Sequence, residues 1–342
     1  MTTDTGHAEI LDRLQRELLG PVTELGRREV TQHAGVSLLQ ARKFWQALGF
    51  PLVQDEEAIF TEADREALVL LGAVIRQRGI DESLALAMIR AVARTTDRLA
   101  VWQTQLIAEA LEVTAGALPD EVPAQAALTM LALSDEIEPL LTYAWRRHLY
   151  AALTRMFGDA GPDQAGPVRV VGFADLVGFT ALVRKATERE LAELVKRFEQ
   201  LASDIITAHG GRVIKTVGDE VLFVSTEPLA AAAIALDLVD ALAEDEKLPT
   251  VRVGMGMGPV LSRLGDVFGT TVNRASRLSD VATAGTVVVD EPLGTRLGSL
   301  SGFTVAEPRR RHLRGLGPVT CFVVTRSRGG RLGASPAPRW LA

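Results

Sequence analysis

The second half of the chain alternates short β-branched runs with amphipathic helical segments in one fixed order. The segments are VRVVGFADL (168–176), a helix that begins at Thr187, two runs around a Gly-Asp turn (213–224), an alanine-rich helix (228–246) and VRVGMGM (251–257). The order β-α-β-β-α-β is the split βαβ arrangement, in which two helices cover one face of a ferredoxin-like sheet. We therefore expect residues 168–326 to form an α+β domain of this type.

The first half has the pattern of an all-α domain. From about residue 11 to residue 153, apolar residues recur at three- and four-residue spacing, and β-branched runs are rare. The segment GDAGPDQAGP (158–167) then marks a joint, because it contains three glycines and two prolines. We predict a helical regulatory and dimerisation domain over 1–150, a linker over 151–167 and a disordered Gly/Pro/Arg-rich tail over 327–342.

A helix-turn-helix pattern occupies residues 28–51, where Ser37 is placed to cap the second helix. The run PLVQDEEAIF (51–60) can form a small wing, and Thr61 can cap the next helix. This pattern suggests DNA binding, but the charge opposes it, since residues 1–150 hold 14 Lys and Arg against 22 Asp and Glu. A DNA-binding domain needs a basic surface, so we expect a regulatory domain that does not bind DNA.

The composition indicates packed cores and a reducing compartment. Apolar residues make up 47% of the chain and the net charge is −6, which disfavours non-specific binding to nucleic acid. Cys321 is the only cysteine, so a disulfide framework is excluded and a cytoplasmic location is expected. We find no apolar run near the roughly 18 residues that a membrane span needs, and we predict no transmembrane segment.

Two aspartates are expected to meet at one end of the predicted sheet. Asp175 ends the first strand, in FADLVGFT, and Asp219 lies at the tip of the hairpin VIKTVGDEVLFV. The first strand of a split βαβ sheet pairs beside that hairpin, so the two carboxylates converge. Mg²⁺ commonly takes one or two carboxylates together with substrate phosphates, and the LVGFT turn can offer N–H groups to phosphate oxygens. Each aspartate alone also fits a helix cap or an ordinary turn residue.

A third segment, GDVFGTTVNRASRL (265–278), contributes Asp266, Asn273 and Arg277. Asn273 and Arg277 are four residues apart and share one face of the predicted helix. Both side chains can reach ribose or phosphate oxygens, and an arginine can bind an anion through two parallel hydrogen bonds. On its own, the segment also fits an amphipathic helix with a structural role only.

Together the three segments resemble the catalytic domain of class III nucleotidyl cyclases, over roughly residues 169–324. The resemblance implies that Asp175 and Asp219 bind two divalent cations, Mg²⁺ or Mn²⁺. It also implies that Asn273 and Arg277 hold the ribose and stabilise the transition state. No protein nucleophile is needed for this chemistry.

The resemblance also explains a lysine in the first strand of the hairpin. Lys215 and Asp266 are implied to read the purine edge: the lysine donates to adenine N1, and the carboxylate accepts from the N6 amine. Guanine presents the opposite pattern, so the pair predicts ATP as substrate and strong discrimination against GTP. The implied reaction is attack of the ribose 3′-hydroxyl on the α-phosphorus, which gives 3′,5′-cyclic AMP and pyrophosphate. Arg314, in LRGLGPV, stands where family members often carry a basic residue for the triphosphate.

Family members pair their catalytic domains head to tail, so that the metal aspartates of one chain face the purine and transition-state pairs of the other. With all six residues on one chain, a homodimer with two equivalent sites is implied. The N-terminal half resembles MerR-type winged helices and the helical regulatory domains that precede some actinobacterial cyclases. It is expected to set the relative orientation of the two catalytic domains.

Several alternatives stay open at this point. Diguanylate cyclases share the βαββαβ core, but the hairpin here reads VGDEV and lacks their Gly-Gly pair and aromatic residue. A DNA-binding regulator with a nucleotide-sensing cyclase-like domain would show no turnover. The N-terminal domain can serve as core and dimer interface alone. It can also bind a fatty acid or another apolar ligand, or sense protons through His148.

Overall fold

The structure is a computed structural model that describes residues 2–25, 27–50, 60–112, 121–159 and 166–327. The chain divides into two compact units, Met1–Phe157 and Gly158–Ala342. Within the described residues, no helix combines the length and the apolar character that crossing a membrane requires. The predicted tail, apart from Ser327, lies outside the described residues, as does most of the predicted wing.

The first unit is helical. Its elements are α1 (Thr2–Leu19), β1 (Val22–Leu25), α2 (Arg27–Ala34), α3 (Leu38–Leu48), β2 (Phe60–Thr61), α4 (Glu62–Arg78), α5 (Glu82–Ala110) and α6 (Val122–Gly158). Ser37 caps α3 in a capping box with Gln40, and Thr61 caps α4 in the same way, as the sequence predicts. The segment predicted as a linker begins as helix, because α6 continues as far as Gly158.

A small core holds α2, α3, α4 and the start of α5 together. Trp45 is its centre, with its ring stacked on Phe60 at 5.4 Å and tilted against Phe44 at 4.8 Å between ring centroids. Leu68 of α4 is fully buried in the same cluster. The helix-turn-helix arrangement of α2 and α3 is therefore built around aromatic packing. Its likeness to the MerR type stays a prediction.

The second unit is an α+β domain. Its elements are β3 (Val168–Leu176), α7 (Phe179–Val183), α8 (Glu188–Ala208), β4 (Arg212–Val217), β5 (Glu220–Ser225), α9 (Pro228–Glu244), β6 (Val251–Pro259), β7 (Leu261–Arg263), β8 (Asp266–Phe268), α10 (Thr270–Val281), β9 (Val287–Asp290), α11 (Glu291–Gly298), β10 (Phe303–Val305), β11 (Arg309–Leu313) and β12 (Gly317–Arg326). The β-α-β-β-α-β order of its first half is the predicted one.

The main sheet has the strand order β10-β12-β9-β6-β3-β5-β4, and β11 pairs with β12 at one side. β3 lies between β5 and β6 and is antiparallel to both, so the first strand pairs beside the β4–β5 hairpin as predicted. β6 and β9 run parallel. The end of β3 and the tip of the hairpin therefore come to the same edge of the sheet.

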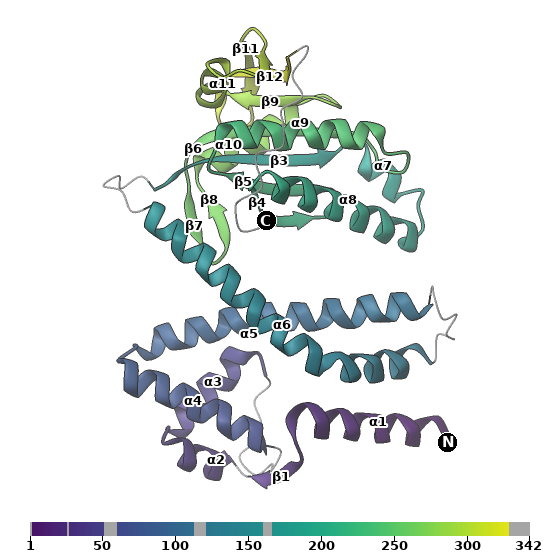
Figure 1. The fold of residues 1–342 in the computed structure, drawn as a ribbon, viewed down its shortest axis with the longest axis vertical. Coiled ribbons are helices and arrows are strands. Elements are labelled where there is room, and N and C mark those ends of the chain that lie inside the picture. The colour runs from purple at the N-terminus through teal and green to yellow at the C-terminus, as the bar shows by residue number, and fades with distance from the viewer. Residues whose placement is uncertain (1, 26, 51–59, 113–120, 160–165, 328–342) are drawn as a thin grey trace. The chain divides into compact units, whose positions relative to one another are not determined.

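Helices cover the two faces of this sheet (Figure 1). α8 and α9 pack on one face, where Phe198, Ile206 and Ile234 are fully buried against alternate residues of β3 and β6. α10 packs on the opposite face, where Ala275 joins Val171 and Phe173 of β3. Period-two alternation along β3 thus serves two separate apolar layers.

The short β7–β8 hairpin is absent from the prediction, which takes the chain directly from the β6 strand to the α10 helix. It turns at Leu264 and Gly265, both with positive φ, and its side chains Leu261, Leu264 and Phe268 are exposed. Strands of three residues are too short to show an alternating pattern. Only the glycine gives a signal, as a turn residue that tolerates positive φ.

Candidate active site

Asp175 and Asp219 come together where the end of β3 meets the tip of the β4–β5 hairpin. Asp175 is the penultimate residue of β3 and pairs with Glu220, the first residue of β5. The next residue, Leu176, donates its N–H to the Asp219 carbonyl at 3.0 Å. Gly218, with φ of 61°, allows the two-residue turn that places Asp219 at the hairpin tip.

Arg252 of β6 lies across from Asp175 and neutralises part of this charge. Its Nε and Nη2 atoms lie 2.7 and 2.5 Å from Asp175 Oδ2, and its Nη1 donates to the Asp280 carbonyl at the end of α10, at 3.2 Å. Burial nevertheless raises the pKa of the Asp175 carboxyl, and the nearby charge of Asp219 raises it further against the lowering effect of Arg252.

Asp175, Asp219 and Glu220 bring three carboxylates to this end of the sheet, and Arg252 is the cation that contacts Asp175. Burial, followed by the charges of Asp175 and Asp219, raises the pKa of Glu220 as well. Asp280 also contributes to this electrostatic field. Oxygen donors in an electronegative, partly desolvated place fit a hard divalent cation that completes its shell with phosphate oxygens and water. The described residues hold no cluster of three or more such groups, so protein ligands alone would leave most of the shell open.

Lys215 and Asp266 form a second pair, on the β4 and β8 strands. Lys215 Nζ lies 2.6 Å from Asp266 Oδ2, and Asp266 Oδ1 accepts the N–H of Val267 at 2.8 Å. The hydrogen bond from Lys215 lowers the pKa of the Asp266 carboxyl. Both side chains are partly exposed, so an amine donor and a carboxylate acceptor are presented side by side.

The third predicted pair lies on α10. Asn273 and Arg277 share the exposed face of this helix, while Thr271, Ala275 and Leu278 are buried on the other face. Arg277 Nη1 contacts Asp280 Oδ2 at 2.9 Å, and the Asn273 side chain makes no hydrogen bond to any described residue. Arg314 is exposed in the β11–β12 turn, likewise without an ion pair in the described part of the chain.

The three pairs make no direct contact with one another that the described hydrogen bonds and ion pairs record. Among the described residues, no hydrogen bond or ion pair joins the aspartates at the sheet edge to Lys215, to Asn273 or to Arg277. Arg252 is the described link between two of them, because it contacts both Asp175 and the Asp280 carbonyl at the end of α10.

Comparison with known proteins identifies the family. The adenylate and guanylate cyclase catalytic domain matches residues 163–326. An adenylate cyclase of Glutamicibacter nicotianae is 39% identical, over 93% of this chain and 83% of that protein. This chain belongs to the class III cyclase family. An adenylate cyclase of Streptomyces coelicolor is 37% identical, over 96% of the cyclase described here and 93% of its own length. A pH-sensitive adenylate cyclase of Mycobacterium tuberculosis is 32% identical, over 92% of this chain and 81% of that protein.

These matches make the chain an enzyme, which decides against a DNA-binding regulator without turnover and against the diguanylate cyclase alternative. The relatives are similar over both units, because matches that cover more than nine-tenths of the chain include the helical first unit. The predicted cyclase fold, with a helical region ahead of the α+β domain, is confirmed.

Sequence reasoning missed one residue that contacts the candidate site, Arg252. It is the single charged residue of the strand VRVGMGM, where it reads as a strand residue facing solvent. Its partner Asp175 is 77 positions away. A cation at the second position of the strand that follows α9 was the available signal, but only the register of β3 with β6 shows which carboxylate it meets.

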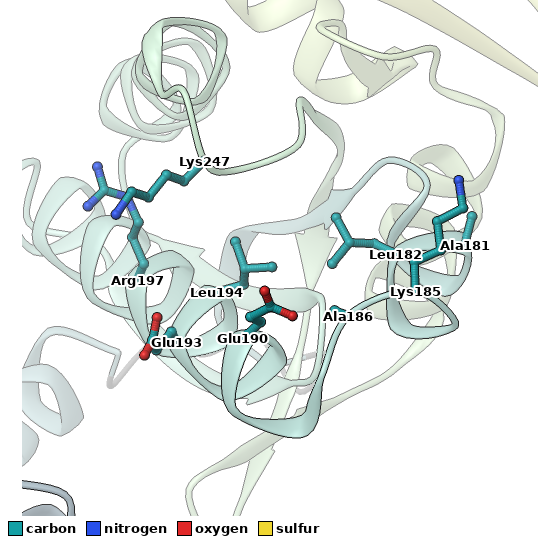
Figure 2. A pocket seen from close by; sticks show the side chains of 9 residues that line it. All are labelled: Ala181, Leu182, Lys185, Ala186, Glu190, Glu193, Leu194, Arg197 and Lys247. Atoms are coloured by element: carbon teal, nitrogen blue, oxygen red, sulfur yellow. The ribbon is translucent and has the colours of Figure 1, made fainter. Parts of the chain in front are cut away.

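A cavity of about 840 Å³ lies away from the predicted site residues, between α7, α8 and the loop before β6. In Figure 2, Leu182 of α7 projects toward Leu194 of α8, with Lys247 and Arg197 on one side and Glu190 below. None of the seven predicted site residues lines it. Two of its charged side chains already have partners within the protein, because Arg197 contacts Asp245 at 2.7 Å and Glu190 forms the capping box with Thr187.

Proposed function

We propose that this cyclase converts ATP to 3′,5′-cyclic AMP and pyrophosphate. The observation that carries the proposal is the Lys215–Asp266 pair, with 2.6 Å between Nζ and Oδ2. An ammonium donor beside a carboxylate acceptor is complementary to adenine N1 and the N6 amine. Guanine presents a donor at N1 and an acceptor at O6, so it would place a donor against the ammonium and an acceptor against the carboxylate. The relatives that match over most of the chain are adenylate cyclases, which agrees with this assignment.

The other residues position the triphosphate and the ribose. Asn273 would hydrogen bond to the ribose, and Arg277 would donate to the phosphoryl oxygens on which charge develops in the transition state. The N–H groups at the start of α7 and the Arg314 guanidinium would bind the triphosphate. The attack is intramolecular, so orienting the 3′-hydroxyl toward the α-phosphorus supplies much of the rate acceleration.

Asp175 and Asp219 would hold two divalent cations, Mg²⁺ or Mn²⁺. When bound, these cations lower the pKa of the attacking 3′-hydroxyl and neutralise charge on the triphosphate. Arg252 occupies Asp175 Oδ2 at 2.7 Å from its Nε. We expect this guanidinium to release the carboxylate in the loaded enzyme and to donate to the nucleotide phosphates instead.

The active enzyme would be a head-to-tail homodimer. Among the described residues, no hydrogen bond or ion pair joins the three pairs directly. This supports the arrangement, because a second copy can bring its α10 face and its Lys215–Asp266 pair to the aspartates of the first. The exposed apolar residues Leu261, Leu264 and Phe268, on the hairpin that carries Asp266, are suited to contact such a partner.

The helical first unit would regulate the dimer. A site formed between two catalytic domains is made or broken by a small rotation of one domain against the other, and a helical unit ahead of the domain can set that rotation. The large number of exposed apolar side chains on α5 and α6 is consistent with a dimer contact in this unit. That the regulatory signal is an apolar ligand or a proton stays a prediction. A proton signal agrees with the mycobacterial relative, which is a pH-sensitive adenylate cyclase.

The test is product formation by the purified full-length protein with ATP or GTP as substrate and Mn²⁺ or Mg²⁺ present. We expect cyclic AMP from ATP and little cyclic GMP from GTP. Asp175→Ala, which removes a proposed metal ligand, should abolish the activity. Equal use of both nucleotides would refute the purine assignment, and cyclic AMP formation by the Asp175→Ala protein would refute the metal assignment.

A matched variant makes the purine test sharper. Lys215→Glu with Asp266→Asn reverses the donor and acceptor pattern without changing the metal aspartates. Each mismatched hydrogen bond to a charged group costs about 1.5–3 kcal/mol, so the ratio of kcat/KM for ATP over GTP should fall by about 10-fold to 150-fold per bond. An unchanged ratio would show that this pair does not read the base.

The dimer has its own test. Asp175→Ala and Asn273→Ala chains should each be inactive alone. In a mixed dimer, one of the two sites receives both defects and the other receives none. Random pairing should therefore recover about a quarter of the wild-type activity. Failure of the mixture, with exchange of chains verified by light scattering or tagged pull-down, would refute the shared site.

A further inference from the structure

α10 lies directly on the backbone of β6. Gly254, Gly256 and Gly258 alternate along β6 and face this helix. A Cβ at Gly254 would collide with the Ser279 backbone N and approach the Ala275 carbonyl to 2.6 Å, and one at Gly258 would come within 2.6 Å of Thr271 Oγ1. The glycines therefore permit a close approach, but they present no side chains that would fix the rotation of the helix about its own axis.

A buried ion pair supplies that constraint. Arg274 of α10 donates from Nε to Asp290 Oδ2 at 2.6 Å and from Nη2 to the Met257 carbonyl at 3.3 Å. It therefore links the helix both to the end of β9 and to the backbone of β6. The Asp290 side chain is 1% exposed, and an unpaired charge at such a place would be strongly unfavourable.

Asp290 is also the junction of three other elements. Its Oδ1 accepts the N–H of Leu293 at 3.1 Å as the N-cap of α11, and its two oxygens lie 3.1 and 3.2 Å from the Met257 N. β6 and β9 are paired up to Met255 and Val289. The Asp290 carboxylate therefore accepts a hydrogen bond from the Met257 N–H, which lies just beyond the end of the β6–β9 pairing.

We propose that Arg274 and Asp290 are positioning residues for α10, the helix that carries Asn273 and Arg277. Their ion pair fixes α10 in rotation on the glycine stripe of β6. Asn273 precedes Arg274 directly, and Arg277 follows it by one turn, so the fixed rotation aims both proposed catalytic side chains out of the subunit. The inference rests on the proposed function for the roles of Asn273 and Arg277, but the seating of α10 can be tested without activity.

The geometry explains why these two residue types are used. Arginine reaches two acceptors in fixed directions through its planar guanidinium, whereas lysine provides a single flexible charge. Asp290 has enough acceptor sites for Arg274 Nε and two backbone N–H groups at once. Thr271 adds a second anchor at the start of the helix, through its hydroxyl and the Pro259 carbonyl at 2.9 Å. Arg252 adds a contact at the end of the helix, from its Nη1 to the Asp280 carbonyl at 3.2 Å. The buried side chains of Ala275 and Leu278 pack through apolar contacts, which carry little rotational preference.

The first test is hydrogen exchange of the full-length protein followed by mass spectrometry. Arg274→Leu should reduce the protection of amides in 270–281 by about tenfold or more, while peptides covering β3 and the β4–β5 hairpin keep their wild-type exchange. The protection of these amides in Arg274→Lys should lie between that of the wild type and that of Arg274→Leu. Arg296→Leu, which removes an exposed arginine from α11, is the matched control and should leave α10 unchanged. Wild-type protection of α10 in Arg274→Leu would overturn the proposal.

The second test uses the proposed division of the active site between two chains. Arg274→Leu should lower kcat by about tenfold or more and change the KM for ATP less than about twofold, because the metal and purine pairs are untouched. Mixed with Asp175→Ala chains, the Arg274→Leu protein should regain activity, since one site of the mixed dimer is then intact. Mixed with Asn273→Ala chains, it should not, because each site then carries a damaged α10.

The outcomes separate this inference from the function on which it rests. The positioning role would be overturned if Asn273→Ala chains restore the activity of Arg274→Leu chains. It would also be overturned if Asp175→Ala chains restore the activity of Asn273→Ala chains but not that of Arg274→Leu chains. If the wild-type protein forms no cyclic nucleotide, the proposed function fails, and hydrogen exchange alone still decides whether Arg274 and Asp290 hold α10. An Asp290→Asn protein, which keeps acceptors for Leu293 and Met257, should show the same loss of α10 protection as Arg274→Leu.

Discussion

Asp245 ties the loop before β6 to α8, and its replacement by asparagine should weaken the catalytic unit in a pH-dependent way. Its carboxylate accepts from Arg197 Nε at 2.8 Å and from the N–H groups of Lys247 and Leu248 at 2.9 and 3.0 Å. Leu248 is buried in the main core. Asparagine keeps an oxygen for the two N–H groups, so Asp245→Asn removes chiefly the charge that faces Arg197.

The magnitude follows from the pKa. The hydrogen bond from Arg197 is the main cause that lowers the pKa of Asp245 from 3.8 to about 2. At about 1.4 kcal/mol per pKa unit this corresponds to about 2.4 kcal/mol. Arg197 is half exposed, so solvent screening reduces the expected loss to about 1–2 kcal/mol.

The sign of the pH dependence is fixed by the lowered pKa. A carboxyl that is more acidic in the folded state stabilises the fold above its unfolded pKa of 3.8, and this contribution is lost as the pH falls toward 2. The difference between wild type and Asp245→Asn should therefore be complete at pH 7 and reduced to about half near pH 3.

Cys321 provides the assay, because it is the only cysteine and is buried in β12 of the same unit. Its labelling by dithiodipyridine, followed across a urea series at pH 7 and pH 3, reports the unfolding of this unit. Arg197→Gln should give the same loss, and the double variant should add little to either. A difference between wild type and Asp245→Asn that stays constant with pH would refute the reasoning.

Three further predictions concern the active site and its support. Gly254→Ala places a methyl group against the backbone of Ser279, so it should lower the thermal midpoint of the catalytic unit in calorimetry. Gly218→Asn, at the positive-φ tip of the hairpin, should lower the free energy of unfolding by less than about 1 kcal/mol in the same measurement. Because the hydrogen bond from Lys215 lowers the pKa of Asp266 below 3.8, the Asp266 carboxylate stays ionised above about pH 5, and the ATP/GTP ratio of kcat/KM should be constant between about pH 5.5 and 7. Deleting residues 1–157 should change the specific activity, and an unchanged rate would remove the regulatory role of the first unit.

The fold of the second unit was accessible from the sequence because its elements are long and regular. The capping box at Thr187 and the apolar stripe of α8 mark a helix that the structure reproduces from Glu188. The three-residue strands β7 and β8 carry no periodic signal, and the sequence does not predict them. The first unit was predicted as helical, but its long α6 runs into the segment predicted as a linker.

The site divides in the same way. Asp175 and Asp219 could be placed together because strand order alone brings their elements to one edge. Arg252, Arg274 and Asp290 could not be assigned partners from the sequence. The partner of Arg252 depends on the register of β6 with β3, and the Arg274–Asp290 pair depends on how α10 packs beside the end of β9. Asp290 carried one local signal, an aspartate before Glu-Pro, which is typical of a helix N-cap. That signal indicates the start of α11 and says nothing about Arg274.

Arg252 contacts two parts of the domain that a head-to-tail dimer would place in different active sites. Its guanidinium binds Asp175, which would serve one site, and the last turn of α10, which would serve the other. Release of Asp175 when a cation and nucleotide bind would leave this arginine free to alter its hold on α10. The two sites of the dimer would then share a free-energy coupling. Its signature would be a Hill coefficient for ATP that departs from one and returns toward one in Arg252→Met.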